Sequence, residues 1–70
     1  MSLEEITSEF KLRRIALAVT QENVAELSGV SLRTIKEFES GKGNPTFATL
    51  NKIADVLGLE IKLELKQSVK

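Results

Sequence analysis

Signals that start and stop helices recur along this chain, and their spacing constrains the fold more than any other feature. Ser and Thr side chains cap helices because their oxygens accept hydrogen bonds from the free N–H groups of the first turn. Four stretches with helix-like apolar spacing are preceded by such a residue, namely Ser2, Thr20, Ser31 and Thr46. Helix-ending signals follow the last three stretches: Gly29, the run GKGNP at 41–45, and Gly58. We therefore predict helices over residues 3–18, 21–27, 32–40 and 47–57, with a start near Ser8 as the alternative for the first.

The composition argues against catalysis. The chain contains neither Cys nor His, which removes disulfides, thiolate zinc sites and the usual general base. We therefore expect no enzymatic activity, no metal and no other cofactor. No stretch approaches the roughly 20 apolar residues of a membrane span, and the acidic N-terminal residues are unlike a signal peptide. A cytoplasmic protein without membrane contact is the expectation. Ten basic and ten acidic residues balance, so any nucleic-acid binding must depend on where the charges lie.

The stretch LEIKLELK at residues 59–66 alternates apolar and charged side chains without a break. This period of two predicts a strand with one buried face. Nothing else in the chain is strand-like, so the strand lacks a partner within its own subunit and is predicted to pair with its twin across a dimer. A fifth helix and addition to another protein's sheet are the alternatives. The predicted dimer face consists of Leu59, Ile61, Leu63 and Leu65.

The centre of the chain, residues 21–38, has the spacing of a helix-turn-helix. Two short predicted helices are joined by about four residues that include Gly29. Such helices cross closely, and Ala25 supplies a small side chain for the crossing. An ordinary antiparallel helix pair within a bundle is the alternative interpretation of this pattern.

The stretch VTQENVAELSGVSLRTIKEFESGKGNPTFATLNKIADVLGL, residues 19–59, resembles the Cro and phage-repressor (XRE-type) helix-turn-helix family. Several elements occur in the family's order: Thr-Gln, Ala-Glu-Leu, Gly-Val-Ser, Thr-Ile, Glu-x-Gly-Lys and Asn-Pro-Thr. The alternating stretch after ADVLGL further resembles the HipB-type antitoxin branch, whose C-terminal strands pair across a dimer.

The resemblance implies a fold and a function. The implied fold is mainly α, a lambda-repressor-like bundle of four to five helices with one C-terminal β-strand that pairs across a homodimer. Residues 1–58 would form the DNA-binding domain and residues 59–70 the dimerisation strand and tail. The implied function is sequence-specific binding of double-stranded DNA at a palindromic operator, as a repressor. Two alternatives stay open: an antitoxin that binds a toxin protein and also represses its own operon, and a protein-interaction module without DNA binding.

The third helix is predicted to read base edges, because a recognition helix enters the major groove with its N-terminal residues foremost. Arg33 can donate two hydrogen bonds to guanine, Leu32 can contact a thymine methyl group, and Lys36 can reach a base or a phosphate. The predicted base contacts are Ser31, Leu32, Arg33, Lys36 and Glu37.

Phosphate contacts are predicted around this helix. Gln21 begins the second helix, where free N–H groups favour an anion, and three further residues match family positions that flank the recognition helix. The predicted set is Gln21, Thr34, Lys42 and Asn44. The family also implies an internal ion pair between Arg14 and Glu39. Residues 31–44 carry a formal charge of +1, from three basic and two acidic residues, and the pairing would remove Glu39 from that sum.

Overall fold

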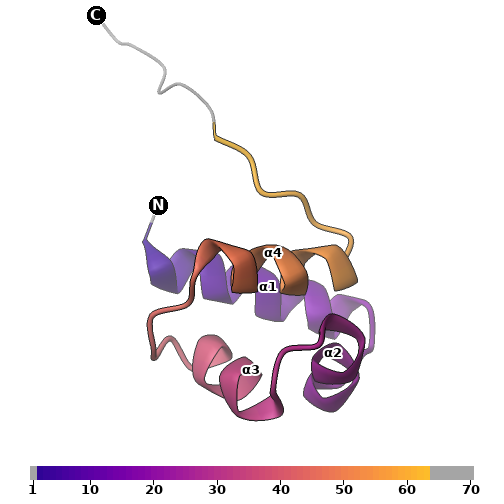
Figure 1. The fold of residues 1–70 in the computed structure, drawn as a ribbon. Coiled ribbons are helices and arrows are strands. Elements are labelled where there is room, and N and C mark those ends of the chain that lie inside the picture. Colours follow the sequence, from indigo (N-terminus) through magenta and orange to yellow (C-terminus); the bar gives the residue numbers. More distant parts are fainter. Residues whose placement is uncertain (1, 64–70) are drawn as a thin grey trace, which may run out of the picture.

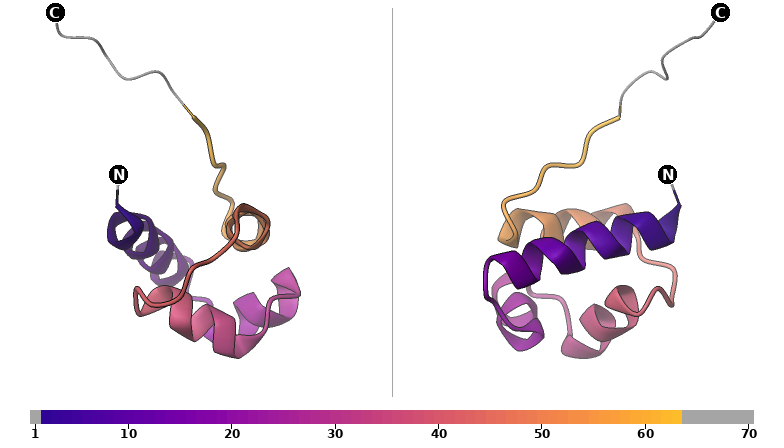
Figure 2. Two further views of the ribbon diagram at one scale, coloured as in Figure 1. Left: turned by 60° about the vertical axis from the view of Figure 1, so that its left-hand side comes forward. Right: turned by 180° about the vertical axis from the view of Figure 1, so that it is seen from behind.

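The computed structural model describes residues 2–63, and over this range the chain forms four helices (Figure 1). They are α1 (Leu3–Ala16), α2 (Gln21–Ser28), α3 (Leu32–Glu39) and α4 (Phe47–Val56). The mainly α fold and the four predicted helices are thereby confirmed. Helices α1 and α4 run across one side of the molecule, and α2 and α3 lie on the opposite side (Figures 1 and 2).

All four predicted caps are formed. Each capping oxygen accepts a hydrogen bond from the backbone N–H three residues further on: Ser2 from Glu5 at 3.1 Å, Thr20 from Asn23 at 3.0 Å, Ser31 from Thr34 at 3.1 Å, and Thr46 from Thr49 at 3.1 Å. The Ser2 N–H donates in return to the Glu5 carboxylate at 2.7 Å, which lowers the pKa of that carboxyl below 4.5, its ordinary value. The helix starts are therefore determined by contacts within one turn.

The end of α1 differs from the prediction, because the helix stops at Ala16 rather than at Ala18. Ala18 adopts a left-handed conformation with φ of 59°, which glycine normally supplies at this position. Its N–H donates to the Ile15 carbonyl at 3.0 Å, and the Val19 N–H donates to the Arg14 carbonyl at 3.3 Å. These two bonds close the helix without a glycine, so the sequence contains no stop signal here.

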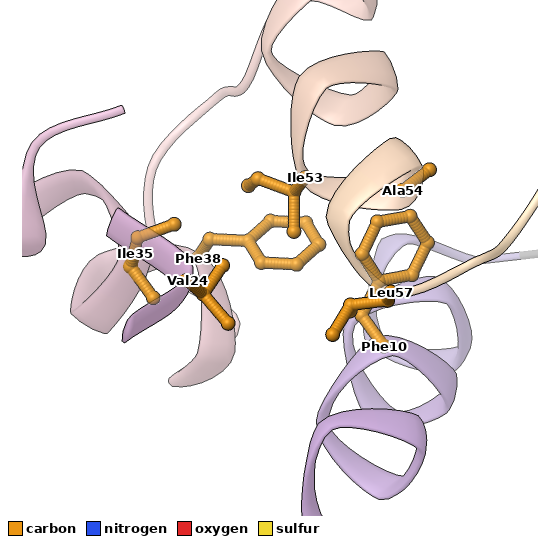
Figure 3. Packing of buried hydrophobic residues seen from close by; sticks show 7 residues of the cluster. All are labelled: Phe10, Val24, Ile35, Phe38, Ile53, Ala54 and Leu57. Atoms are coloured by element: carbon orange, nitrogen blue, oxygen red, sulfur yellow. The ribbon is translucent and has the colours of Figure 1, made fainter. Parts of the chain in front are cut away.

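Every helix contributes to one apolar core (Figure 3). The rings of Phe10 from α1 and Phe38 from α3 meet edge to face, with centroids 5.2 Å apart and planes inclined by 70°, an arrangement that aromatic pairs favour. The side chains of the core are Phe10, Val24, Ile35, Phe38, Ile53, Ala54 and Leu57, all of them buried. Because α3 supplies two of these residues on its inner face, its outer face is held in a defined orientation.

The chain reverses direction after α4 through a turn that α1 stabilises. Gly58 has φ of 69°, and the Leu59 N–H donates to the Ala54 carbonyl at 2.8 Å, the arrangement of a glycine-terminated helix end. From α1, the Arg13 Nε donates to the Leu57 carbonyl at 2.8 Å. This contact attaches the end of α4 to α1. The residues that follow turn back on the side of the molecule where α1 and α4 lie (Figure 1).

Residues 59–63 carry no regular secondary structure, and residues 2–63 contain no β-strand. Leu59 and Ile61 pack against the core, whereas Leu63 is fully exposed. Leu65, the fourth residue of the predicted dimer face, lies outside the described residues. The paired strand therefore stays a prediction. None of the four helices is long and apolar enough to cross a membrane.

Candidate nucleic-acid interface

Helices α2 and α3 form a close pair joined by a short turn. Gly29 ends α2 in a left-handed conformation with φ of 77°, and its N–H donates to the Ala25 carbonyl at 3.0 Å. Val24 of α2 and Ile35 of α3 are both fully buried, and Ala25 packs partly buried against the same core. The two helices therefore share one set of apolar contacts, which fixes the position of α3 relative to α2.

The outer face of α3 presents a group of charged side chains. Arg33 and Lys36 are both exposed, and Arg33 lies 3.5 Å from the Glu37 carboxylate one turn away. An exposed pair of this kind is weak, so Arg33 can exchange Glu37 for a stronger partner at small cost.

Two other residues predicted to contact bases, Leu32 and Ser31, have less of their side chains available to DNA. Leu32 is half-buried, so only part of its side chain is available to a thymine methyl group. The Ser31 hydroxyl caps α3 and also donates to the Thr34 hydroxyl at 2.8 Å. With one accepted and one donated hydrogen bond already made, this hydroxyl has one lone pair left. Ser31 can therefore accept one hydrogen bond from a base but cannot donate one without breaking its contact with Thr34.

Beside α3 lies a hollow of about 210 Å³ between this helix and the loop that leads to α4. Three of the four predicted phosphate contacts line it, namely Thr34, Lys42 and Asn44. Thr46 and Thr49 at the start of α4 line it as well. A helix start carries free N–H groups and the positive end of the helix dipole. Glu37 lines the hollow too. The hollow thus combines a cation, hydroxyl groups and a helix N-terminus, which favour a phosphate, with one carboxylate, which opposes it.

Thr46 and Thr49 were not among the predicted contacts. The available signal was the position of Thr46 directly after Asn-Pro, which marks a helix start in the loop after α3. The sequence pattern does not indicate how close that helix start lies to α3.

Gln21, the fourth predicted phosphate contact, lies apart from the hollow and belongs to a different group of side chains. Its Nε2 donates to the Glu39 carboxylate at 3.0 Å. An amide nitrogen carries two hydrogens, so one of them remains for a phosphate. The contact with Glu39 orients the Gln21 side chain at the start of α2.

Arg14 and Glu39 form an ion pair within the fold. The Arg14 Nε and Nη2 donate to the two carboxylate oxygens of Glu39 at 2.6 and 3.1 Å. The Arg14 Nη1 donates to the Val19 carbonyl at 2.9 Å. The side chains keep only 15% and 7% of their surface exposed, so Arg14 neutralises Glu39 internally. With Glu39 set aside, the three basic residues and Glu37 give residues 31–44 a charge of +2 toward solvent.

Helices α2 and α3 are two short helices that pack against each other at a glycine turn, and the outer face of α3 is charged and exposed. This arrangement defines a helix-turn-helix protein. Residues 10–63 match the helix-turn-helix family, and this match extends over more than half of the chain. The chain belongs to the helix-turn-helix family of the Cro and phage-repressor (XRE) type.

A known repressor is similar in sequence. The chain is 45% identical over 49 residues to the cryptic phage CTXphi transcriptional repressor RstR of Vibrio cholerae serotype O1. The matched part covers 70% of this chain and 44% of RstR. The chain thus spans less than half the length of this relative.

Proposed function

We propose that the protein is a transcriptional repressor that binds double-stranded DNA with α3 in the major groove. The observation that carries this proposal is the exposed face of α3, which presents Arg33 and Lys36. The same helix borders a hollow that holds Lys42, threonine hydroxyls and the start of α4. Membership of the helix-turn-helix family supports it, and so does the similarity to a phage transcriptional repressor.

Arg33 is the principal base-reading residue in this proposal. Its guanidinium can donate two parallel hydrogen bonds to the N7 and O6 atoms of guanine, a contact worth roughly 1–3 kcal/mol of discrimination. Its weak, exposed pair with Glu37 is exchanged for the guanine contact at small cost. Lys36, one turn further on, contacts a base or the adjacent phosphate. Ser31 and Leu32 contribute the weaker contacts that their geometry permits.

The backbone contacts place α3 in register with the groove. Thr34, Lys42 and Asn44 surround one phosphate at the start of α4, and Gln21 contacts another at the start of α2. These contacts carry no sequence information, but they determine the depth and the angle at which α3 enters the groove.

The proposed binding unit is a homodimer, in which residues 1–58 bind DNA and residues 59–70 connect the two copies. The alternating pattern of residues 59–66 and the full exposure of Leu63 support this part of the proposal. A two-fold axis places two recognition helices about 34 Å apart on successive major grooves of a palindromic site.

The experiment is selection of duplexes from a random library at fixed salt, followed by a salt titration with the selected site. We expect a palindromic site, and we expect log K to fall with log salt by about 0.9 per phosphate contact. Arg33→Ala should weaken specific binding by roughly 1–3 kcal/mol and relax the preference at one base position of each half-site.

Two lysine variants complete the test. Lys42→Ala should weaken binding to all sequences almost equally and make the salt slope shallower. Lys11→Ala removes the same charge from an exposed position on α1, and we expect it to leave both affinity and slope close to those of the parent protein. No binding to any duplex at low salt would refute the repressor and favour a protein-interaction module.

A further inference from the structure

Glu37 is the one acidic side chain that residues 31–44 present to solvent. Glu39, the other acidic residue of this stretch, is paired with Arg14 inside the fold. The Glu37 side chain keeps 51% of its surface exposed, and its contact with Arg33 one turn away places both residues on the same face of α3. In the proposed complex this face meets a duplex that carries a dense row of negative charges. An acidic residue here lowers the affinity for DNA in general unless another contact compensates for it.

Contacts with the following loop determine the position of Glu37. Its carbonyl oxygen accepts hydrogen bonds from the Lys42 N–H at 3.0 Å and from the Ser40 hydroxyl at 2.8 Å. A Cβ at Gly43 would lie 4.0 Å from the Glu37 Cβ, so the loop after α3 passes directly beside this residue. Glu37 is therefore located where the proposed recognition helix meets the loop that supplies the proposed phosphate contacts.

The side chain of Glu37 has different neighbours on its two sides. Toward the start of α3, a carboxylate oxygen lies 3.5 Å from the Arg33 Nε. Toward the loop, Glu37 lines the hollow together with Lys42. Among residues 2–63, the ion pair that Glu37 forms is the one with Arg33. When Arg33 binds a guanine instead, the carboxylate is left without this cation while it faces a negatively charged duplex.

One base edge in the major groove matches an ionised carboxylate better than the others do. A carboxylate accepts hydrogen bonds and cannot donate them. Guanine presents two acceptors in this groove, thymine presents an acceptor and a methyl group, and adenine presents an acceptor beside its amino donor. Cytosine presents an amino donor alone. The carboxylate is thus repelled by guanine and thymine, is partly matched by adenine and is fully matched by cytosine.

The spacing of Arg33 and Glu37 limits how far this cytosine lies from the guanine. Four residues advance an α-helix by about 6 Å, and neighbouring base pairs lie about 3.4 Å apart. The two side chains therefore reach base pairs that are at most two steps apart. Because Arg33 donates only and Glu37 accepts only, the pair suits a guanine and a cytosine.

We infer that Glu37 determines sequence specificity by accepting a hydrogen bond from the amino group of a cytosine in the major groove, and that it weakens binding to duplexes without this donor. The inference rests on the proposed function. In the proposed complex, Arg33 and Glu37 each read a base. One carboxylate thus has opposite effects, because it stabilises the complex with the correct site and destabilises the complexes with other sequences.

Selection of duplexes with Glu37→Gln tests the inference through a change of base. A glutamine amide both donates and accepts, and it pairs with the N6 and N7 atoms of adenine. We expect the parent protein to select cytosine within two base pairs of the guanine position that Arg33→Ala identifies. Glu37→Gln should select adenine in place of this cytosine, and Glu37→Ala should show no preference there. A cytosine preference that persists in both variants would overturn the inference.

Affinities at fixed salt test the two opposite effects. In the parent protein, replacing the cytosine should weaken binding by about 5- to 150-fold, the usual cost of one mismatched base pair. Glu37→Ala should lose most of this penalty, and it should bind an unrelated duplex more tightly than the parent protein does. Because the second affinity is expected to rise, unfolding of the variant cannot imitate this result.

Glu9→Ala is the matched control, because it removes the same charge from an exposed position on α1. We expect this variant to keep the full penalty for replacing the cytosine, whatever its loss of negative charge does to the affinity for DNA in general. If Glu37→Ala keeps the full penalty as well, the carboxylate does not read the cytosine and the inference is wrong.

The outcomes separate this inference from the proposed function. A selected site without cytosine within two base pairs of the guanine would overturn the inference and leave the repressor in place. A gain by the same factor on every duplex in Glu37→Ala would show that the carboxylate only repels phosphates, with the same consequence. A protein that binds no duplex at low salt would overturn the inference and the proposed function together.

Discussion

The polar contacts of Glu39 connect three helices. Its carboxylate, on α3, accepts hydrogen bonds from Arg14 of α1 and Gln21 of α2. Because the Glu39 side chain is only 7% exposed, removing it leaves the Arg14 guanidinium buried without its counter-charge. The loss of one member of such a pair is far more costly than the pair's net contribution.

We therefore expect Glu39→Ala to lower the free energy of unfolding by ~3–5 kcal/mol, measured by urea denaturation. Glu37→Ala is the matched control, because it removes the same side chain two residues away from an exposed pair with Arg33. That variant should change stability by less than about 1 kcal/mol. Equal losses in the two variants would contradict a structural role for the buried pair.

At the scale of the element, the end of α4 is the part of the fold on which the C-terminal segment depends. Gly58 takes a left-handed conformation, and a Cβ at this position would lie 3.3 Å from the Arg13 Nη2. Gly29 at the end of α2 has a similar φ of +77°, but a Cβ there would meet nothing within 4 Å. Both glycines thus adopt a left-handed backbone conformation, but an added Cβ would meet a neighbouring side chain only at Gly58.

Alanine at either glycine should cost roughly 1–2 kcal/mol from the left-handed backbone alone. We expect Gly58→Ala to lower the free energy of unfolding by slightly more than Gly29→Ala, because the new methyl group also pushes the Arg13 Nη2 aside by a few tenths of an ångström and so strains the contact of Arg13 with the Leu57 carbonyl. In an Arg13→Ala background the two substitutions should become equal. If Gly29→Ala costs as much in the parent protein, Arg13 does not hold this turn.

For the whole molecule, the C-terminal segment has two separable roles in the proposed homodimer. Leu59 and Ile61 cover part of the core of their own subunit, and Leu63 is fully exposed, which suits the proposed contact with a second one. Removing residues 59–70 therefore uncovers the core and deletes the proposed dimer contact at once. Leu63→Glu is expected to delete only the dimer contact.

We expect the chain shortened after Gly58 to be monomeric in sedimentation, to keep much of its helix content by circular dichroism and to unfold at a lower temperature. Leu63→Glu should also be monomeric but should keep the parent's unfolding temperature at low concentration. Both should bind the palindromic site far more weakly, because one recognition helix no longer positions the other. A shortened protein that still dimerises would show that the segment has another role.

The sequence by itself determined the features that depend on near neighbours. The four helix starts could be predicted because each cap is three residues from the N–H that it binds. The charged outer face of α3 followed from its helical spacing. The Arg14–Glu39 pair was suggested by family resemblance rather than by spacing, since 25 positions separate the two residues.

Only the tertiary structure decided which distant groups meet. Arg13 binds the Leu57 carbonyl across 44 positions, and no local pattern indicates this contact. The start of α4 joins Lys42 in one hollow beside α3, while Gln21 lies apart with Glu39. The physical reason is that hydrogen bonds within one turn form wherever the helix forms, whereas contacts between elements depend on how the buried side chains pack the helices against one another.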